Sequence, residues 1–156
     1  MNPNENIAAR EEFLTFRLGQ EEYAIDILQV REIRAQEPVT RIADVARFVM
    51  GVIHLRGAIV PILDLRLKFD LPRGTDDSTV VIILSLAGRL MGVVVDAVSD
   101  VVSLLPEQIR PTPALNGAID STFVRGIAPL DGRMLIVADV ATLVASPGET
   151  PAALAA

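Results

Sequence analysis

Cysteine and tryptophan are absent from this chain of 156 residues, and histidine occurs only once, as His54. Without cysteine there is no disulfide framework, no thiolate metal ligand and no thiol nucleophile. The single histidine has no obvious serine and aspartate partners for nucleophilic catalysis, and ordinary zinc sites need more His or Cys ligands. We therefore predict that the protein is not an enzyme and uses no metal or other cofactor.

Basic residues are also in deficit, because 14 Lys and Arg face 20 Asp and Glu and give a formal net charge of −6. Binding to nucleic acid needs clustered positive charge, so we expect no nucleic-acid partner. The N-terminus has no apolar signal segment, and the most apolar stretch, residues 80–98, is interrupted by Gly88 and Arg89. These features predict a cytoplasmic protein without membrane insertion.

What the chain has in abundance is aliphatic side chains in short runs between turn signals. Hydrophobic residues make up 51% of the sequence, yet only five Phe and one Tyr are aromatic. The runs and turns predict a mainly β fold of about eight to ten strands. Helical spacing is confined to residues 44–50, 106–109 and 139–144, of which the last is a candidate C-terminal helix. We expect flexible tails at residues 1–11 and 146–156.

An internal repeat organises these strands. Residues 48–65 align without a gap on residues 123–140, with six identities in 18 positions. A weaker echo relates residues 16–28 to residues 84–98. Each half has room for about five short strands, the content of a small closed barrel. The sequence thus predicts one domain over residues 12–145, with a first barrel at about residues 13–72 and a second at about residues 78–144.

The segment 54–66, HLRGAIVPILDLR, carries most of the unusual residues. Arg56 and Gly57 mark a hairpin turn, and Asp64, like its repeat counterpart Asp139, is expected to cap the turn that follows. Pro61 cannot donate a ladder hydrogen bond, which places it on an edge strand or at a bulge. Glu32 is a natural ion-pair partner for Arg56, and the pair is either a solvated surface contact or an interface element.

Four segments carry a more specific signal. They are FLTFRLGQEEYAIDILQVREIR at 13–34, GVIHLRGAIVPILDLRLKF at 51–69, VVIILSLAGRLMGVVVDAVSDVVSLLPEQIRP at 80–111 and GIAPLDGRMLIVADVATLV at 126–144. Residues 51–66 fit the pattern Gly-x-x-x-Leu-Arg-Gly-x-Ile-Val-Pro-x-x-Asp-Leu-Arg. Together these segments resemble the CheW family of bacterial chemotaxis adaptor proteins.

The resemblance implies two five-stranded SH3-like barrels side by side, meeting at a hydrophobic seam. It also implies a non-enzymatic scaffold that couples the cytoplasmic tips of methyl-accepting chemoreceptors to the regulatory domain of the histidine kinase CheA. The scaffold would be recruited from the cytoplasm to membrane-associated receptor arrays. By motif, the expected interface residues with receptor or kinase are Val30, Glu32, Ile33, Gly51, His54, Leu55, Arg56, Gly57, Val80, Val81 and Val101.

Two alternatives remain open at this point. The protein could be a CheW-like adaptor of a parallel chemosensory pathway, such as one that controls pili. A small-ligand sensor that uses the aliphatic seam as a pocket is an interpretation from another class, although few convergent polar groups support it.

Overall fold

The computed structural model describes residues 10–35, 37–43, 48–68, 79–111 and 123–144. Within these ranges the chain forms ten β-strands and four helical turns. The predicted mainly β fold is confirmed. None of the described helices is long and apolar enough to cross a membrane.

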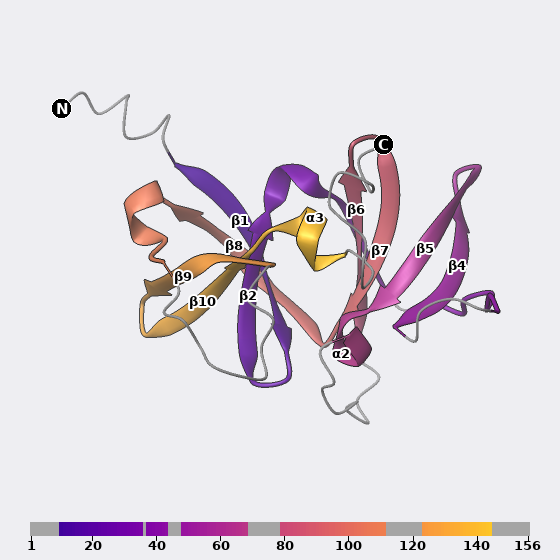
Figure 1. The fold of residues 1–156 in the computed structure, drawn as a ribbon, viewed down its shortest axis with the longest axis horizontal. Coiled ribbons are helices and arrows are strands. Elements are labelled where there is room, and N and C mark those ends of the chain that lie inside the picture. The colour runs from indigo at the N-terminus through magenta and orange to yellow at the C-terminus, as the bar shows by residue number, and fades with distance from the viewer. Residues whose placement is uncertain (1–9, 36, 44–47, 69–78, 112–122, 145–156) are drawn as a thin grey trace.

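Two five-stranded sheets lie side by side, with short helical turns between them (Figure 1). The terminal barrel has the strand order β8-β1-β2-β10-β9 and contains β1 (Glu11–Leu18), β2 (Glu21–Asp26), β8 (Ala97–Leu104), β9 (Val124–Leu130) and β10 (Arg133–Ala138). The central barrel has the order β3-β6-β7-β5-β4 and contains β3 (Val30–Ala35), β4 (Val49–Leu55), β5 (Ala58–Asp64), β6 (Val80–Leu86) and β7 (Arg89–Val95). The helical turns are η1 (Ile27–Gln29), α2 (Leu65–Lys68), η2 (Pro106–Gln108) and α3 (Val140–Leu143).

The barrels are not the two halves of the sequence, so the predicted boundaries at residues 13–72 and 78–144 are wrong. The hairpin β1–β2 of the first half pairs with β8 and β10 of the second half, while β6–β7 pairs with β3 and β5 of the first. Because the halves resemble each other, a strand could pair equally well with a neighbour from its own half or with the corresponding strand of the other half. The route of the chain decides, since η1 leads from β2 into the other barrel.

The repeat itself is confirmed in its details. The backbone N–H of Asp64 donates to the carbonyl oxygen of Phe48 at 2.7 Å, and that of Asp139 donates to Phe123 at the same distance. A Cβ added to Gly51 would lie 2.2 Å from the carbonyl oxygen of Thr40, and one added to Gly126 would meet Arg110 O at 2.5 Å. Each hairpin thus needs glycine where a preceding segment crosses it closely.

The largest hydrophobic cluster lies between the barrels and is here called the seam cluster. It joins residues of both sheets, including Phe16 and Tyr23, whose rings stack at 5.7 Å, and Ile82 and Leu84 on the other side. Each barrel also has a smaller core of its own. The shared cluster is what holds the two barrels in one unit.

Several local expectations have clear outcomes. The helical windows at 106–109 and 139–144 become the single turns η2 and α3. The window at 44–50 is wrong in its described part, because Val49 and Met50 begin β4, and its residues 44–47 lie outside the described residues. Most of the expected tails also lie outside them, and β1 already includes Glu11. The edge placement of Pro61 is wrong, because β5 lies between β7 and β4, whereas the bulge of the β4–β5 ladder lies next to Pro61, between the pairs Gly51–Ile62 and Val49–Leu63. Its missing N–H is tolerated because the parallel ladder to β7 begins one residue later, at Ile62.

Candidate protein-interaction site

The turn between β4 and β5 holds an arginine in an unfavourable backbone conformation. Arg56 has φ 50° and Gly57 has φ 84°, the pattern of a two-residue turn with both φ values positive. The counterpart turn has Asp131 at φ 50° and Gly132 at φ 79°. Asp tolerates positive φ far better than Arg does, so the arginine at this tip is retained at a conformational cost. Ala87 has φ 51° before Gly88 in the β6–β7 turn, so this conformation is shared by three hairpin turns of the described residues.

Arg56 forms the ion pair with Glu32 that the sequence indicates. Arg56 Nη2 lies 2.9 Å from Glu32 Oε2, and the Arg56 side chain is 80% exposed. Glu32 also accepts a hydrogen bond from Arg34 Nη1 at 2.9 Å. The pKa of Glu32 is lowered, first by this hydrogen bond and then by the charge of Arg56. The pair joins the hairpin tip to β3, which is an edge strand of the central barrel.

Exposed aliphatic side chains also occur on β3 and β5 of the central barrel. Ile33 on β3 is 46% exposed, and Ile59 on β5 is 72% exposed beside the exposed His54, its partner across the hairpin. Arginine is enriched at protein interfaces, and accessible aliphatic side chains offer apolar contact area. We call the set Glu32, Ile33, Arg56 and Ile59 the Arg56 face.

The other expected interface residues separate into three groups. Val30 and Val80 are half-buried against the seam cluster, so they contribute to the joint between the barrels. Leu55 and Val81 are buried in the core of the central barrel and offer little surface to a partner. Val101 is 51% exposed, but it lies on β8 of the terminal barrel.

That position of Val101 identifies a second surface that sequence reasoning missed. Val101 pairs with Leu14, which lies four residues before the end of β1. Ile33 pairs with Ile82, which lies four residues before the end of β6. Val101 and Ile33 therefore occupy corresponding positions in the two barrels. By the same spacing Asp100 corresponds to Glu32. The repeat offset of 75 relates Ile59 to Met134, which is also exposed.

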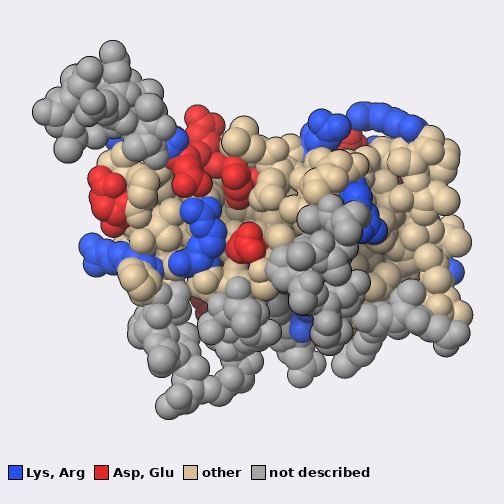
Figure 2. All heavy atoms as spheres, turned by 45° about the horizontal axis from the view of Figure 1, so that its top comes forward, with Lys and Arg blue, Asp and Glu red and all other residues tan. Residues whose placement is uncertain are grey.

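The second surface, here called the Arg133 face, consists of Asp100, Val101, Arg133 and Met134. Arg133 Nη2 lies 2.9 Å from Asp100 Oδ1 and also pairs with Glu22. Hydrogen bonds from Arg133 lower the pKa of Glu22 and, together with the Thr15 hydroxyl, that of Asp100. Figure 2 shows charged side chains gathered over the terminal barrel, whereas most of the central barrel on the same side is uncharged.

The two faces differ in where the arginine stands. In the central barrel it precedes the turn glycine, as Arg56, whereas in the terminal barrel it follows the glycine, as Arg133. The weaker repeat echo ends at Leu28 and Val98 with an offset of 70, so extending it would relate Glu32 to Val102. The offset of 68 that relates Glu32 to Asp100 follows from the strand pairing.

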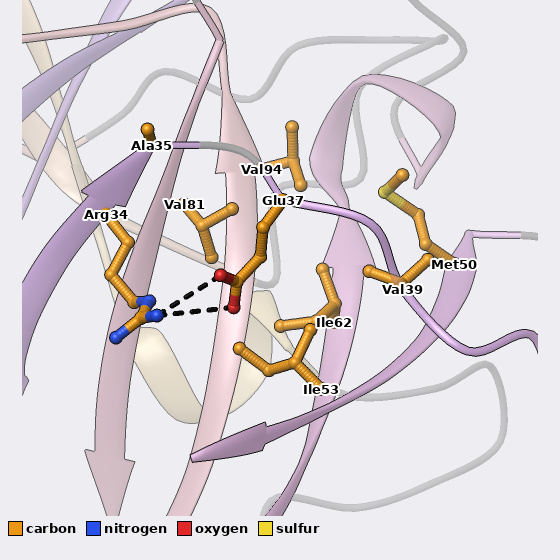
Figure 3. A pocket seen from close by; sticks show the side chains of 9 residues that line it. All are labelled: Arg34, Ala35, Glu37, Val39, Met50, Ile53, Ile62, Val81 and Val94. Carbon is orange, nitrogen blue, oxygen red and sulfur yellow. Dashed lines mark hydrogen bonds and ion pairs between the residues drawn. The ribbon is translucent and has the colours of Figure 1, made fainter.

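A narrow pocket opens at one end of the central barrel (Figure 3). It spans about 260 Å³ including its mouth, and its apolar wall contains Ile53, Ile62 and Val81. Arg34 and Glu37 point toward each other at the pocket, with Arg34 Nη2 3.2 Å from Glu37 Oε2. Arg34 and Glu37 are the charged residues of the pocket lining, and they pair with each other.

Comparison with known proteins agrees with this geometry. The family model described as CheW-like domain matches residues 12–148. A chemotaxis protein CheW of Klebsiella aerogenes is 51% identical over 138 residues, which cover 87% of this chain and 82% of the relative. A probable chemotaxis protein CheW of Rhizobium etli is 36% identical, covering 85% and 86% of the two chains.

A solved structure shares the whole fold. The crystal structure of scaffolding protein TtCheW from Thermoanaerobacter tengcongensis superposes with a TM-score of 0.81 at 34% identity. The match covers 89% of this chain and 95% of that one. With its paired barrels and the motif around Arg56, the chain belongs to the CheW family and is a scaffolding adaptor of chemotaxis.

Proposed function

We propose that this protein is a non-enzymatic adaptor that connects the cytoplasmic tips of methyl-accepting chemoreceptors to a CheA-type histidine kinase. The protein would act from the cytoplasm and join membrane-associated receptor arrays through its partners, without inserting into the bilayer. Family membership supports the role of a scaffold. The partners follow from the resemblance of the motifs around Glu32 and Arg56.

The Arg56 face carries this proposal. An exposed arginine is held at positive φ and is oriented by Glu32 at 2.9 Å, and Ile33 and Ile59 of the same barrel are accessible. Ala87 adopts a similar φ of 51° in the β6–β7 turn, so the exposure of Arg56 and its ion pair carry the proposal, not the backbone conformation. A docking role accounts for the arginine, because an oriented charge beside apolar side chains gives both specificity and contact area.

An adaptor also needs a second contact, and the Arg133 face supplies a related surface on the other barrel. A chain with two similar faces is able to hold two partners at once, each through a modest interface. Weak contacts of this kind gain strength when many copies assemble in one array. We propose that the adaptor works by geometry, so that receptor movement changes how the kinase is held.

The test exchanges the two turn residues. Arg56→Asp places in the first turn the residue that the second turn already accommodates at the same φ, so the fold should persist. The purified variant is added to CheA-type kinase and receptor-bearing membranes, and phosphoryl transfer is followed. We expect the wild type to raise kinase activity and make it sensitive to receptor ligand, and the variant to lose both effects.

The matched control is Asp131→Arg, which places arginine in the counterpart turn. It should fold and couple as the wild type does, because the Arg56 face is intact. Normal coupling by a folded Arg56→Asp variant would remove the Arg56 face from the mechanism. If the wild type itself binds neither partner, the protein serves a parallel chemosensory pathway, and its genomic neighbours identify that pathway.

A further inference from the structure

The two crossovers between the barrels are built differently. At the first, the carboxylate of Asp26 accepts a hydrogen bond from Leu28 N at 3.0 Å, a contact within its own turn. At the second, Asp96 Oδ2 accepts from the backbone N–H of Gly19 at 2.7 Å, and Asp96 N donates to Arg17 O at 3.0 Å. Asp96 therefore fastens the end of β7 in the central barrel to the β1–β2 turn of the terminal barrel.

The helical turn α2 approaches Asp96 from the central barrel. Arg66 on α2 is buried, and its Nη1 lies 3.4 Å from Asp96 Oδ1. The opposite side of the guanidinium is fixed by Asp64, with Nε 3.1 Å from Oδ1 and Nη2 3.2 Å from Oδ2. One rigid arginine thus connects the end of β5 to the residue that holds the other barrel.

A second cation of α2 reaches the terminal barrel directly. The ammonium group of Lys68 donates a hydrogen bond to the carbonyl oxygen of Leu143 in the last turn of α3. It also lies 5.2 Å from the centre of the Phe48 ring. A cation at the C-terminal end of a helical turn is favourably placed, since the last carbonyl groups have no partner within the turn.

The repeat shows that these contacts are specific to one side of the molecule. The counterpart of Arg66 on α3 is Ala141, and the counterpart of Lys68 is Leu143. Neither side chain can form an ion pair, so α3 packs into the seam cluster by apolar contacts. Two kinds of contact consequently join the barrels. The apolar seam opposes their separation but is non-directional, whereas the polar contacts of α2 require particular distances and angles.

We propose that Arg66 and Lys68, acting with Asp96, are positioning residues that set the angle between the two barrels, and that this fixed angle is what couples the partners. The inference rests on the proposed adaptor function, because a fixed angle matters only if each barrel holds a partner. Apolar contacts alone permit small rotations with little change in buried area, whereas the contacts of α2 are satisfied at one orientation.

The experiment uses Asp96→Asn with Lys68→Met in the full chain. Asparagine retains an oxygen for Gly19 N but loses the charge that Arg66 faces, and methionine retains the apolar stem of the lysine. Arg66 itself stays, so Asp64 keeps its buried partner. The matched control is Asp26→Asn, which changes the carboxylate at the other crossover.

The angle is read from the distance distribution between two spin labels. The chain has no cysteine, so Ala35→Cys on β3 and Ser103→Cys on β8 place one label on an exposed position of each barrel. We expect a narrow distribution in the labelled parent and in Asp26→Asn, and a broadened or shifted one in the double variant. Circular dichroism checks that all variants are folded at the working temperature.

Coupling is then measured without labels. The double variant should still bind receptor membranes and kinase singly, yet lose ligand control of the kinase, and restoring Lys68 or Asp96 alone should recover part of it. An unchanged distance distribution, or full ligand control despite a broadened one, overturns the inference. If instead the wild type gives no coupling, the proposed function fails, while the distance measurement still decides whether α2 sets the angle.

Discussion

Asp64 and Asp139 occupy equivalent positions in the internal repeat. The contribution of the buried Asp64 charge to the free energy of unfolding can therefore be measured against Asp139 as a control. Asp64 ends β5 and Asp139 directly follows β10, and both donate a backbone N–H to a Phe carbonyl. Asp64 is fully buried against Arg66, whose side chain is only 6% exposed. Asp139 instead accepts a hydrogen bond from the hydroxyl group of Thr142 at 2.7 Å. The change Asp→Asn at both positions isolates the charge.

The magnitude follows from the contacts that each new amide keeps. In Asp64→Asn the side-chain oxygen would still accept from Arg66 N, which lies 2.9 Å from the carboxylate in the wild type, but the guanidinium would lose its nearest negative charge. Breaking a buried ion pair typically costs about 3–5 kcal/mol, and the remaining contact with Asp96 places this case near about 3 kcal/mol. Asp139→Asn retains an acceptor for Thr142, so its cost should be within about 0.5 kcal/mol.

Urea unfolding followed by circular dichroism measures both. With a slope of about 1–3 kcal/mol per molar urea, the midpoint of Asp64→Asn should fall by about 1–3 M. The midpoint of Asp139→Asn should hardly move. Equal midpoints for the two variants would refute the reasoning. They would mean that the negative charge of Asp64 does not offset the cost of burying the positive charge of Arg66.

Three further predictions concern the fold. Gly51→Ala should lower the free energy of unfolding by about 3 kcal/mol, because its methyl group has no room, whereas Gly57→Ala, with open space, should cost about 1 kcal/mol in chemical denaturation. The pKa of Glu22 lies below its ordinary 4.5 through its hydrogen bond from Arg133, so that contact stabilises fully above pH 4.5 and is lost as pH falls through the lowered pKa. An Arg133→Gln protein should therefore lose less stability on acidification than the wild type, and an equal loss in acid titration by circular dichroism would contradict this. Finally, two chains cut between residues 72 and 73 should each fail to form a barrel and should fold when mixed, as gel filtration and circular dichroism can check; a folded single half would contradict the strand exchange.

The sequence was informative wherever a structure is decided locally. The turn at Arg56 and Gly57 and the two strands that it joins are where the residues indicate. Alternation and turn residues act over a few positions, so they transfer directly to the fold. The buried place of Val81 shows the limit, because an aliphatic residue in a strand has the same pattern whether it faces a core or a partner.

What could not be predicted depends on choices between equivalent partners. Two similar halves offer each strand two similar neighbours, and no residue of β1 or β6 favours one over the other by type. The contacts of Arg66 with Asp96 were hidden for the same reason, since they join elements that are adjacent only after the strands are exchanged. The Arg133 face could be recognised only by relating Asp100 on β8 to Glu32 on β3, and both residues lie beyond the segments that the weaker echo aligns.

The exchange of hairpins between the halves also affects how the protein is made. The central barrel is continuous in sequence from Val30 to Val95, so it can close as soon as β7 leaves the ribosome. The hairpin β1–β2 is synthesised first, but its neighbour β10 ends about 40 residues after Val95, a delay of about 2–8 seconds at usual rates of translation. During that time the first strands of the chain have open edges, and the last strands to be made complete the barrel that the first ones began.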